Sequence, residues 1–193
     1  NYKQNYYAET KVSVKETVVR LGNIFSELKA NKKVLLFLIS FFFYIDGVYT
    51  IIEMSTAYGK DVGIGDSSML LALLLTQVVA FPCSILFGKL ARRFESEKLI
   101  LVCIGAYFFI ALFALQLDTA WKFWFLATCV GVFQGAIQAL SRSYYAKIIP
   151  KEKASEYFGV FDIFGKGASF LGTMLMGIST QLFHTSKAGV VMI

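Results

Sequence analysis

Charged and amide side chains interrupt two long apolar stretches, and their chemistry is the most informative in the chain. Gln134 and Gln138 lie in apolar sequence just before Arg142, and Asp162 and Lys166 lie in the next apolar stretch. Polar and charged groups are costly in hydrocarbon, so they usually line a cavity, pair with one another, or do both. Because Asp162 and Lys166 are four residues apart, they would share one face of a helix and could form an ion pair.

Asp46 places another carboxylate in the middle of an apolar stretch. It would lie about 18 Å along a helix that begins at Val34, at a rise of about 1.5 Å per residue, and Lys166 is expected at a similar depth on another helix. One lysine cannot pair one to one with both Asp46 and Asp162, so one carboxylate would stay solvated in a cavity or carry a proton. A proton-coupling network and a purely structural network both remain open.

The apolar run 121–140 carries two adjacent stripes. Gly131 and Gly135 are small residues at an interval of four, which lets a neighbouring helix pack closely. Gln134 and Gln138 form the next stripe; they would hydrogen-bond a polar solute or a neighbouring helix, and Gln138 is the better candidate for lining a cavity. Arg142 follows this run and is expected at the membrane surface or in the adjoining loop, because long basic side chains reach toward water.

Five apolar runs would position these side chains. They span about residues 34–54, 68–87, 99–117, 121–140 and 157–183, and another begins at about 188 and is cut off. The chain has 193 residues, 56% of them hydrophobic, and runs of about 20 residues are long enough to cross about 30 Å of hydrocarbon. The run 99–117 carries no charge and is expected on the outside of the helix bundle, facing lipid. Gly165 and Gly172 in the fifth run are expected at close helix contacts. The sequence therefore predicts an all-α polytopic membrane protein.

The distribution of basic residues predicts the orientation of these helices. Most of the 19 Lys and Arg residues fall in 1–33, 88–98 and 142–153, whereas Lys60, Lys122 and Lys187 fall on the other side. Basic loops stay in the cytoplasm, so residues 1–33 are expected to be a cytoplasmic connector. Its apolar residues recur at helical spacing from a start near Ser13, which predicts an amphipathic helix that lies either on an anionic membrane surface or on the protein itself: Val14, Val18, Leu21, Phe25 and Leu28.

Several classes of function are disfavoured. The single histidine, His184, has no catalytic or metal-binding partners nearby in the sequence, and no glycine-rich phosphate loop is present. Cys83, Cys103 and Cys129 lie in apolar runs without metal-ligand spacing. The net charge of +6 reflects basic loops between membrane helices rather than a nucleic-acid site. We therefore expect no catalytic residues, metal, cofactor or nucleic-acid partner.

Three segments resemble the C-terminal half of a major facilitator superfamily permease, and within it the vacuole-effluxer (autophagy-related amino-acid effluxer-like) family. They are FFFYIDGVYTII (Phe41 to Ile52), GAIQALSRSYYAKIIP (Gly135 to Pro150) and EYFGVFDIFGKGASFLG (Glu156 to Gly172). The loop that begins at Gly88 matches the superfamily's cytoplasmic loop motif in part: Gly88, Leu90 and Arg93 fit, but Arg92 stands where an acidic residue is typical.

The resemblance implies twelve helices in two six-helix halves. This chain would be the second half, with its last helix truncated, and Gly88, Arg93 and Arg142 would belong to cytoplasmic loop and gating regions. The implied partners are membrane lipid, a small-molecule solute and the N-terminal half of the same transporter. The implied location is a bacterial plasma membrane or a vacuolar membrane.

The resulting hypothesis is a secondary transporter of amino acids or similar small solutes that works by alternating access, with proton coupling as an added hypothesis. The alternative is a non-transporting membrane protein, an assembly or sensing module, that binds a partner through residues 1–33 or through its cytoplasmic loops.

Overall fold

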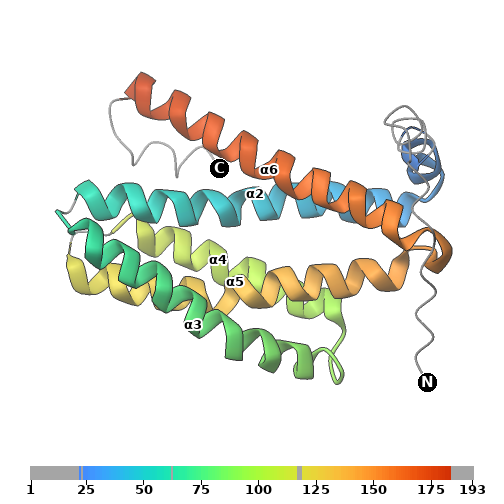
Figure 1. The fold of residues 1–193 in the computed structure, drawn as a ribbon, viewed down its shortest axis with the longest axis horizontal. Helices are drawn as coiled ribbons and strands as arrows, with labels where there is room; N and C mark the ends of the chain where they lie inside the picture. The colour runs from blue at the N-terminus through green and yellow to red at the C-terminus, as the bar shows by residue number, and fades with distance from the viewer. Residues whose placement is uncertain (1–21, 23, 62, 117–118, 184–193) are drawn as a thin grey trace, which may run out of the picture.

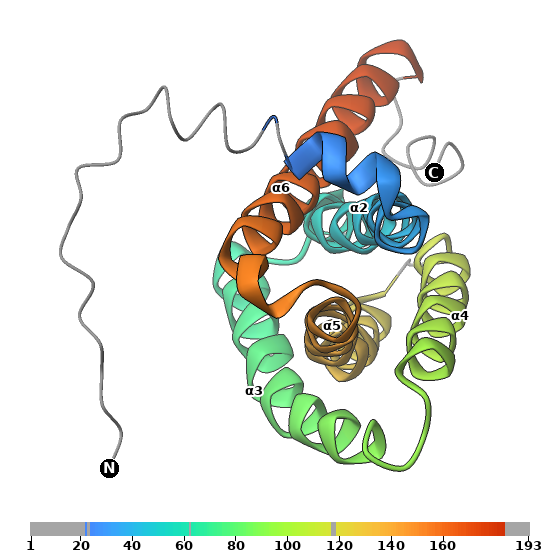
Figure 2. The same ribbon diagram turned by 90° about the vertical axis from the view of Figure 1, so that its right-hand side faces the viewer.

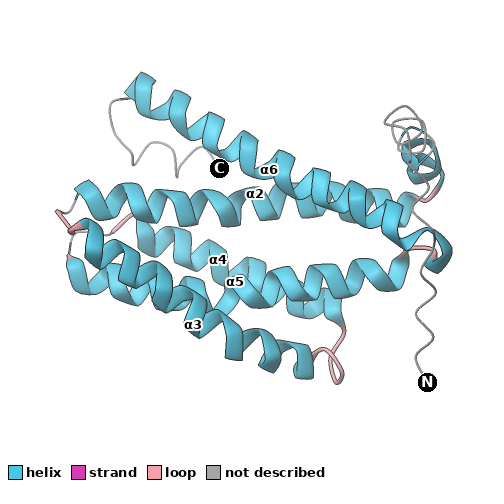
Figure 3. Cartoon of the chain, viewed as in Figure 1, coloured by secondary structure: helices cyan, strands magenta, loops and turns pink. Residues whose placement is uncertain are grey.

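A computed structural model of the chain describes residues 22, 24–61, 63–116 and 119–183, and all regular secondary structure in these ranges is helical (Figure 3). The helix expected to start near Ser13 and the run expected near 188 lie outside the described residues. A short helix at 24–30 precedes the long ones. These are α2 (Lys32–Asp61), α3 (Asp66–Leu90), α4 (Ser96–Ala114), α5 (Ala120–Ile148) and α6 (Ala154–Phe183), and a 3-10 turn (Lys151–Lys153) joins α5 to α6.

Four of these helices have the length and composition of membrane spans in the part of the chain that the structure describes: Lys32–Glu53, Asp66–Leu90, Ser96–Ala114 and Ala120–Ile148. The first covers only part of α2, and α6, which carries Asp162 and Lys166, is not one of the four. A helix satisfies its own backbone hydrogen bonds and can therefore cross hydrocarbon without unpaired peptide groups. The predicted all-α polytopic membrane fold is confirmed.

The helix α5 lies in the middle of the bundle. It packs against α3, α4 and α2, and α2 in turn packs along α6 (Figures 1 and 2). The buried side chains of α2 and α5 form much of one continuous apolar core, and among the most completely buried are Leu38, Ile45, Leu126, Ile137 and Leu140. On α4 one face is buried around Cys103 and the other exposes large apolar side chains such as Phe109, at 70% of its surface.

The contact between α5 and α3 depends on two glycines. A Cβ atom on Gly131 would lie 2.9 Å from the backbone oxygen of Thr76, and one on Gly135 would lie 2.7 Å from the backbone oxygen of Ala80. These separations are shorter than carbon and oxygen tolerate, so the two backbones approach as closely as they do only because both residues lack a side chain. The glycine stripe therefore determines which face of α5 meets α3.

A tight turn joins α2 to α3. Gly63 has φ of +78°, a left-handed conformation that glycine adopts without steric cost. Its N–H donates to the carbonyl of Lys60 at 3.0 Å, and the N–H of Ile64 donates to the carbonyl of Gly59 at 2.9 Å. These bonds satisfy carbonyl groups at the end of α2 and reverse the chain.

The end of the bundle that carries residues 24–30, 91–95 and 149–153 is rich in polar contacts, and we call it the basic end. In the 24–30 helix Ile24 and Leu28 are each only 1% exposed, whereas Phe25 is 42% exposed. The predicted stripe contained Phe25 and not Ile24, so the buried face differs there from the expected one. Glu27 accepts a hydrogen bond from Lys153 at 2.5 Å, and this bond raises the pKa of Lys153.

The glycine contact can be tested by adding a methyl group. We expect Gly135→Ala to destabilise the purified chain in detergent by roughly 1–3 kcal/mol, the usual cost of overpacking. The measurement is the thermal unfolding midpoint. The matched control is Gly105→Ala on α4, where an added Cβ meets nothing within 4 Å and alanine favours the helix by up to about 1 kcal/mol. Equal midpoints for the two variants would show that α5 and α3 are not in backbone contact.

Candidate functional site

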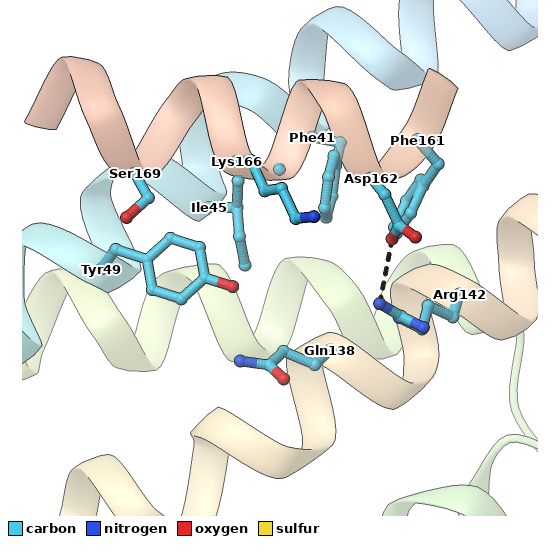
Figure 4. Close-up of a pocket in the computed structure, with 10 residues that line it drawn as sticks. Phe41, Ile45, Tyr49, Gln138, Arg142, Phe161, Asp162, Lys166 and Ser169 are labelled. Carbon is cyan, nitrogen blue, oxygen red and sulfur yellow. Dashed lines mark hydrogen bonds and ion pairs between the residues drawn. The ribbon is translucent and has the colours of Figure 1, made fainter. Parts of the chain in front are cut away.

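A cavity of about 330 Å³ opens between α2, α5 and α6 (Figure 4). Small-molecule sites occupy about 300–1,000 Å³, so the cavity has room for a small solute. Its wall combines aromatic and aliphatic side chains with a few polar and charged ones. The lining residues are Phe41, Ile45 and Tyr49 from α2, Gln138 and Arg142 from α5, and Phe161, Asp162, Gly165, Lys166 and Ser169 from α6.

An ion pair crosses this cavity. Nη2 of Arg142 donates to Oδ1 of Asp162 at 3.1 Å, and the guanidinium group also lies over the ring of Phe161, 5.8 Å from its centroid. The two side chains are 62% and 50% exposed. A pair with this exposure contributes only about 0–1 kcal/mol to stability. The ion pair can therefore open and close at little cost in free energy. What it adds to the site is a link between α5 and α6 across the cavity.

This arrangement differs from the pairing expected from sequence spacing. Asp162 was expected to pair with Lys166, four residues along the same helix, but it bonds to Arg142 across the cavity. Lys166 has no hydrogen bond or ion pair within the described residues. Arg142 was expected at the surface or in a loop, and instead it forms part of the cavity wall. The reason is that α5 continues as a helix to Ile148, so Arg142 stays on the face that carries Gln138.

Asp46 does not line this cavity, contrary to its expected partnership with Lys166. It faces α6 farther along, where a Cβ on Gly172 would lie 2.6 Å from Oδ1 of Asp46 and 2.5 Å from Oγ1 of Thr50. Both oxygens are buried and have no hydrogen-bond partner among the described residues. Gly172 is six residues beyond Lys166, or about 9 Å along the helix. The structure thus separates Asp46 from the charged group formed by Arg142, Asp162 and Lys166.

The two glutamines occupy different places. Gln138 lines the main cavity, and its amide lies on the α5 side of that cavity, across from Tyr49 (Figure 4). Gln134 lines a much smaller cavity of about 30 Å³ with Ser55 and Thr76. That volume is close to the space one water molecule takes in the liquid, so this site is too small for an organic solute.

The remaining residues expected from sequence lie in three different places. Gly131 and Gly135 face α3, whereas Gly165 lies at the cavity, where an added Cβ would meet the ring of Phe41 at an ordinary 3.5 Å. Gly88 and Arg93 are exposed at the basic end, and neither reaches the cavity.

Sequence reasoning missed the two hydroxyl groups of the cavity, Tyr49 and Ser169. A regular spacing could have identified both: Phe41, Ile45 and Tyr49 recur every four residues on α2, and Ser169 follows Lys166 by three on α6. It also missed the hydrogen bond of 2.6 Å between Tyr44 and Ser141. Because Ser141 donates to the carbonyl of Ile137, Tyr44 donates to Ser141 and ties α2 to α5 beside the cavity.

Comparison with known proteins identifies the family. A family model described as "Vacuole effluxer Atg22 like" matches residues 3–193. The chain belongs to this family. Among curated relatives, "Uncharacterized MFS-type transporter YxiO" of Bacillus subtilis (strain 168) is 46% identical over 188 residues, which cover 97% of this chain and 44% of that protein.

Fungal members of the Atg22-like family are more distant. "Autophagy-related protein 22" of Saccharomyces cerevisiae (strain ATCC 204508 / S288c) is 29% identical over 181 residues, covering 88% of this chain and 34% of that protein. The protein of the same name from Vanderwaltozyma polyspora is 28% identical over 168 residues, which cover 81% of this chain and 32% of that protein. The chain thus spans less than half the length of these relatives. The family is one of membrane transporters and effluxers, not of enzymes.

The contact between Asp46, Thr50 and Gly172 makes a testable prediction. In Gly172→Ala the new methyl group would overlap both side-chain oxygens, so we expect a loss of roughly 1–3 kcal/mol of stability. The double variant Thr50→Ala/Gly172→Ala should recover part of that loss, because one of the two obstructing oxygens is gone.

Thermal unfolding of the purified chain measures both variants. Gly159→Ala on the same helix is the control, since an added Cβ there meets nothing within 4 Å. If Gly172→Ala and Gly159→Ala unfold at the same temperature, α2 and α6 do not meet at Gly172.

Proposed function

We propose that the full-length protein is a secondary active transporter of amino acids or similar small solutes, and that this chain supplies its C-terminal half. The observation that carries the proposal is the cavity between α2, α5 and α6. Its wall combines apolar side chains with a few polar and charged groups. Membership of a transporter and effluxer family supports the same class of function.

We propose that transport proceeds by alternating access between two halves. Among the described residues, the cavity is lined by side chains of α2, α5 and α6 alone. Relatives more than twice as long as the chain have room for a second bundle. Rocking of one bundle against the other around a shared central site would then expose a solute to one side of the membrane at a time.

The basic end is proposed to face the cytoplasm, in a bacterial plasma membrane or a vacuolar membrane. The support is the concentration of Lys and Arg residues in 1–33, 88–98 and 142–153. Gly88 in the last turn of α3 and Arg93 in the turn that follows are exposed in this region, and we propose that this segment contributes to gating at the cytoplasmic side.

Proton coupling is proposed to involve Asp46. Its Oδ1 atom is buried without a hydrogen-bond partner in the described part of the chain, and burial of an unpaired charged group is costly. Asp46 also sits at the contact between α2 and α6. Gain or loss of a proton there would change how these two helices pack, which links protonation to the shape of the cavity wall.

The test is uptake of radiolabelled neutral amino acids by full-length protein in liposomes, with and without a pH gradient. We expect protein-dependent uptake that the gradient increases. In Asp46→Asn the gradient effect should fall about tenfold, the loss that corresponds to about 1.4 kcal/mol, while exchange of solute without a gradient continues. Asp66→Asn, at an exposed position at the start of α3, is the control. Absence of uptake for every amino acid tested would support the non-transporting alternative.

A further inference from the structure

The charges of the main cavity do not balance. Arg142, Asp162 and Lys166 are its only charged lining residues in the part of the chain that the structure describes. Arg142 and Asp162 form an ion pair of 3.1 Å and neutralise each other. Lys166 is left with no protein partner among the described residues, so the cavity carries one uncompensated positive charge.

Lys166 lies near the middle of α6, where its exposed side chain lines the cavity. Lys166 is twelve residues from the start of α6 at Ala154, or about 18 Å along the helix axis. A lysine near the middle of a helix in a membrane bundle usually faces a cavity or a counter-charge. In Figure 4 its amino group points into the space shared with Tyr49, Gln138 and Asp162. An anionic group that enters the cavity would find this amine unpaired.

The rest of the wall defines what kind of anion fits. Hydroxyl groups of Tyr49 and Ser169 and the amide of Gln138 can complete the hydrogen bonds of a small polar head group. Phe41, Ile45 and Phe161 offer apolar surface beside it. With about 330 Å³ available, the wall suits a small molecule that has one anionic end and one apolar end.

We propose that Lys166 binds the carboxylate of the transported solute, and that this contact selects amino acids over analogues that lack the carboxylate. The proposal rests on the proposed transport function and adds the residue and the chemical group that decide specificity. An ammonium–carboxylate hydrogen bond is stronger than a bond between neutral groups and counts for more where water is excluded. The opposing possibility is that a carboxylate of the N-terminal half neutralises Lys166.

The experiment compares each amino acid with its amino alcohol, which keeps the side chain and the amine but lacks the carboxylate. Leucine with leucinol, and phenylalanine with phenylalaninol, compete against labelled leucine or phenylalanine for uptake by the full-length protein in liposomes. We expect wild type to prefer each amino acid by at least about tenfold, a difference of about 1.4 kcal/mol.

In Lys166→Met that preference should vanish, and in Lys166→Arg most of it should remain. Lys60→Met, at an exposed position at the end of α2 outside the cavity, should behave as wild type. Size-exclusion chromatography of each variant confirms that it is folded.

Three results would overturn the inference. If Lys166→Met binds amino acids as tightly as wild type and still prefers them, the carboxylate binds elsewhere. If Lys166→Met keeps the preference but binds amino acids and amino alcohols more weakly by the same factor, Lys166 pairs within the protein. If both classes compete equally in wild type, transport stands but carboxylate selection does not. Failure of wild type to take up any solute would instead contradict the proposed function itself.

Discussion

The close approach of α5 to α3 is the contact on which the rest of the structure depends. Gly131 and Gly135 bring the two backbones together, and they thereby fix the rotation of α5 about its own axis. The adjacent stripe of α5 carries Gln138 and Arg142, and with α5 held in this orientation it faces the cavity beside α2 and α6. Small residues on one face thus place polar residues on the next, as close packing in membranes requires.

Polar side chains play different parts at the basic end of the bundle and in the cavity. At the basic end, hydrogen bonds connect helices: Tyr145 donates to the carbonyl of Tyr157 at 3.0 Å, Lys147 donates to Ser96 at 3.0 Å, and Tyr144 donates to Glu97. In the cavity the only ion pair within the described residues is the half-exposed one between Arg142 and Asp162. Hydrogen bonds at the basic end and a weak ion pair in the cavity suit a protein whose helices stay together at the basic end and change their contacts in the cavity.

The sequence predicted the helices well because apolar runs of membrane length have few alternatives to the helical state. It also predicted the small-residue stripe of Gly131 and Gly135, because a spacing of four on a helix is a local property. It did not predict the partner of Asp162, since spacing shows only that Lys166 is within reach and not that Arg142 approaches from another helix. Likewise, the position of Asp46 along its helix gave a depth but not the direction in which the side chain points, and it faces Gly172 instead of Lys166.

The central claim is that a solute occupies the space between α2, α5 and α6, and protection of a cysteine tests it most directly. Ser169→Cys is made in full-length protein whose native cysteines are replaced, and its labelling by a membrane-impermeant maleimide is followed with and without a mixture of neutral amino acids. We expect that Ser169→Cys is labelled and that the amino acids slow the labelling. Labelling of Phe109→Cys, on the outer face of α4, should not respond to them. Labelling of Ser169→Cys that is unchanged by amino acids the protein transports would contradict the claim.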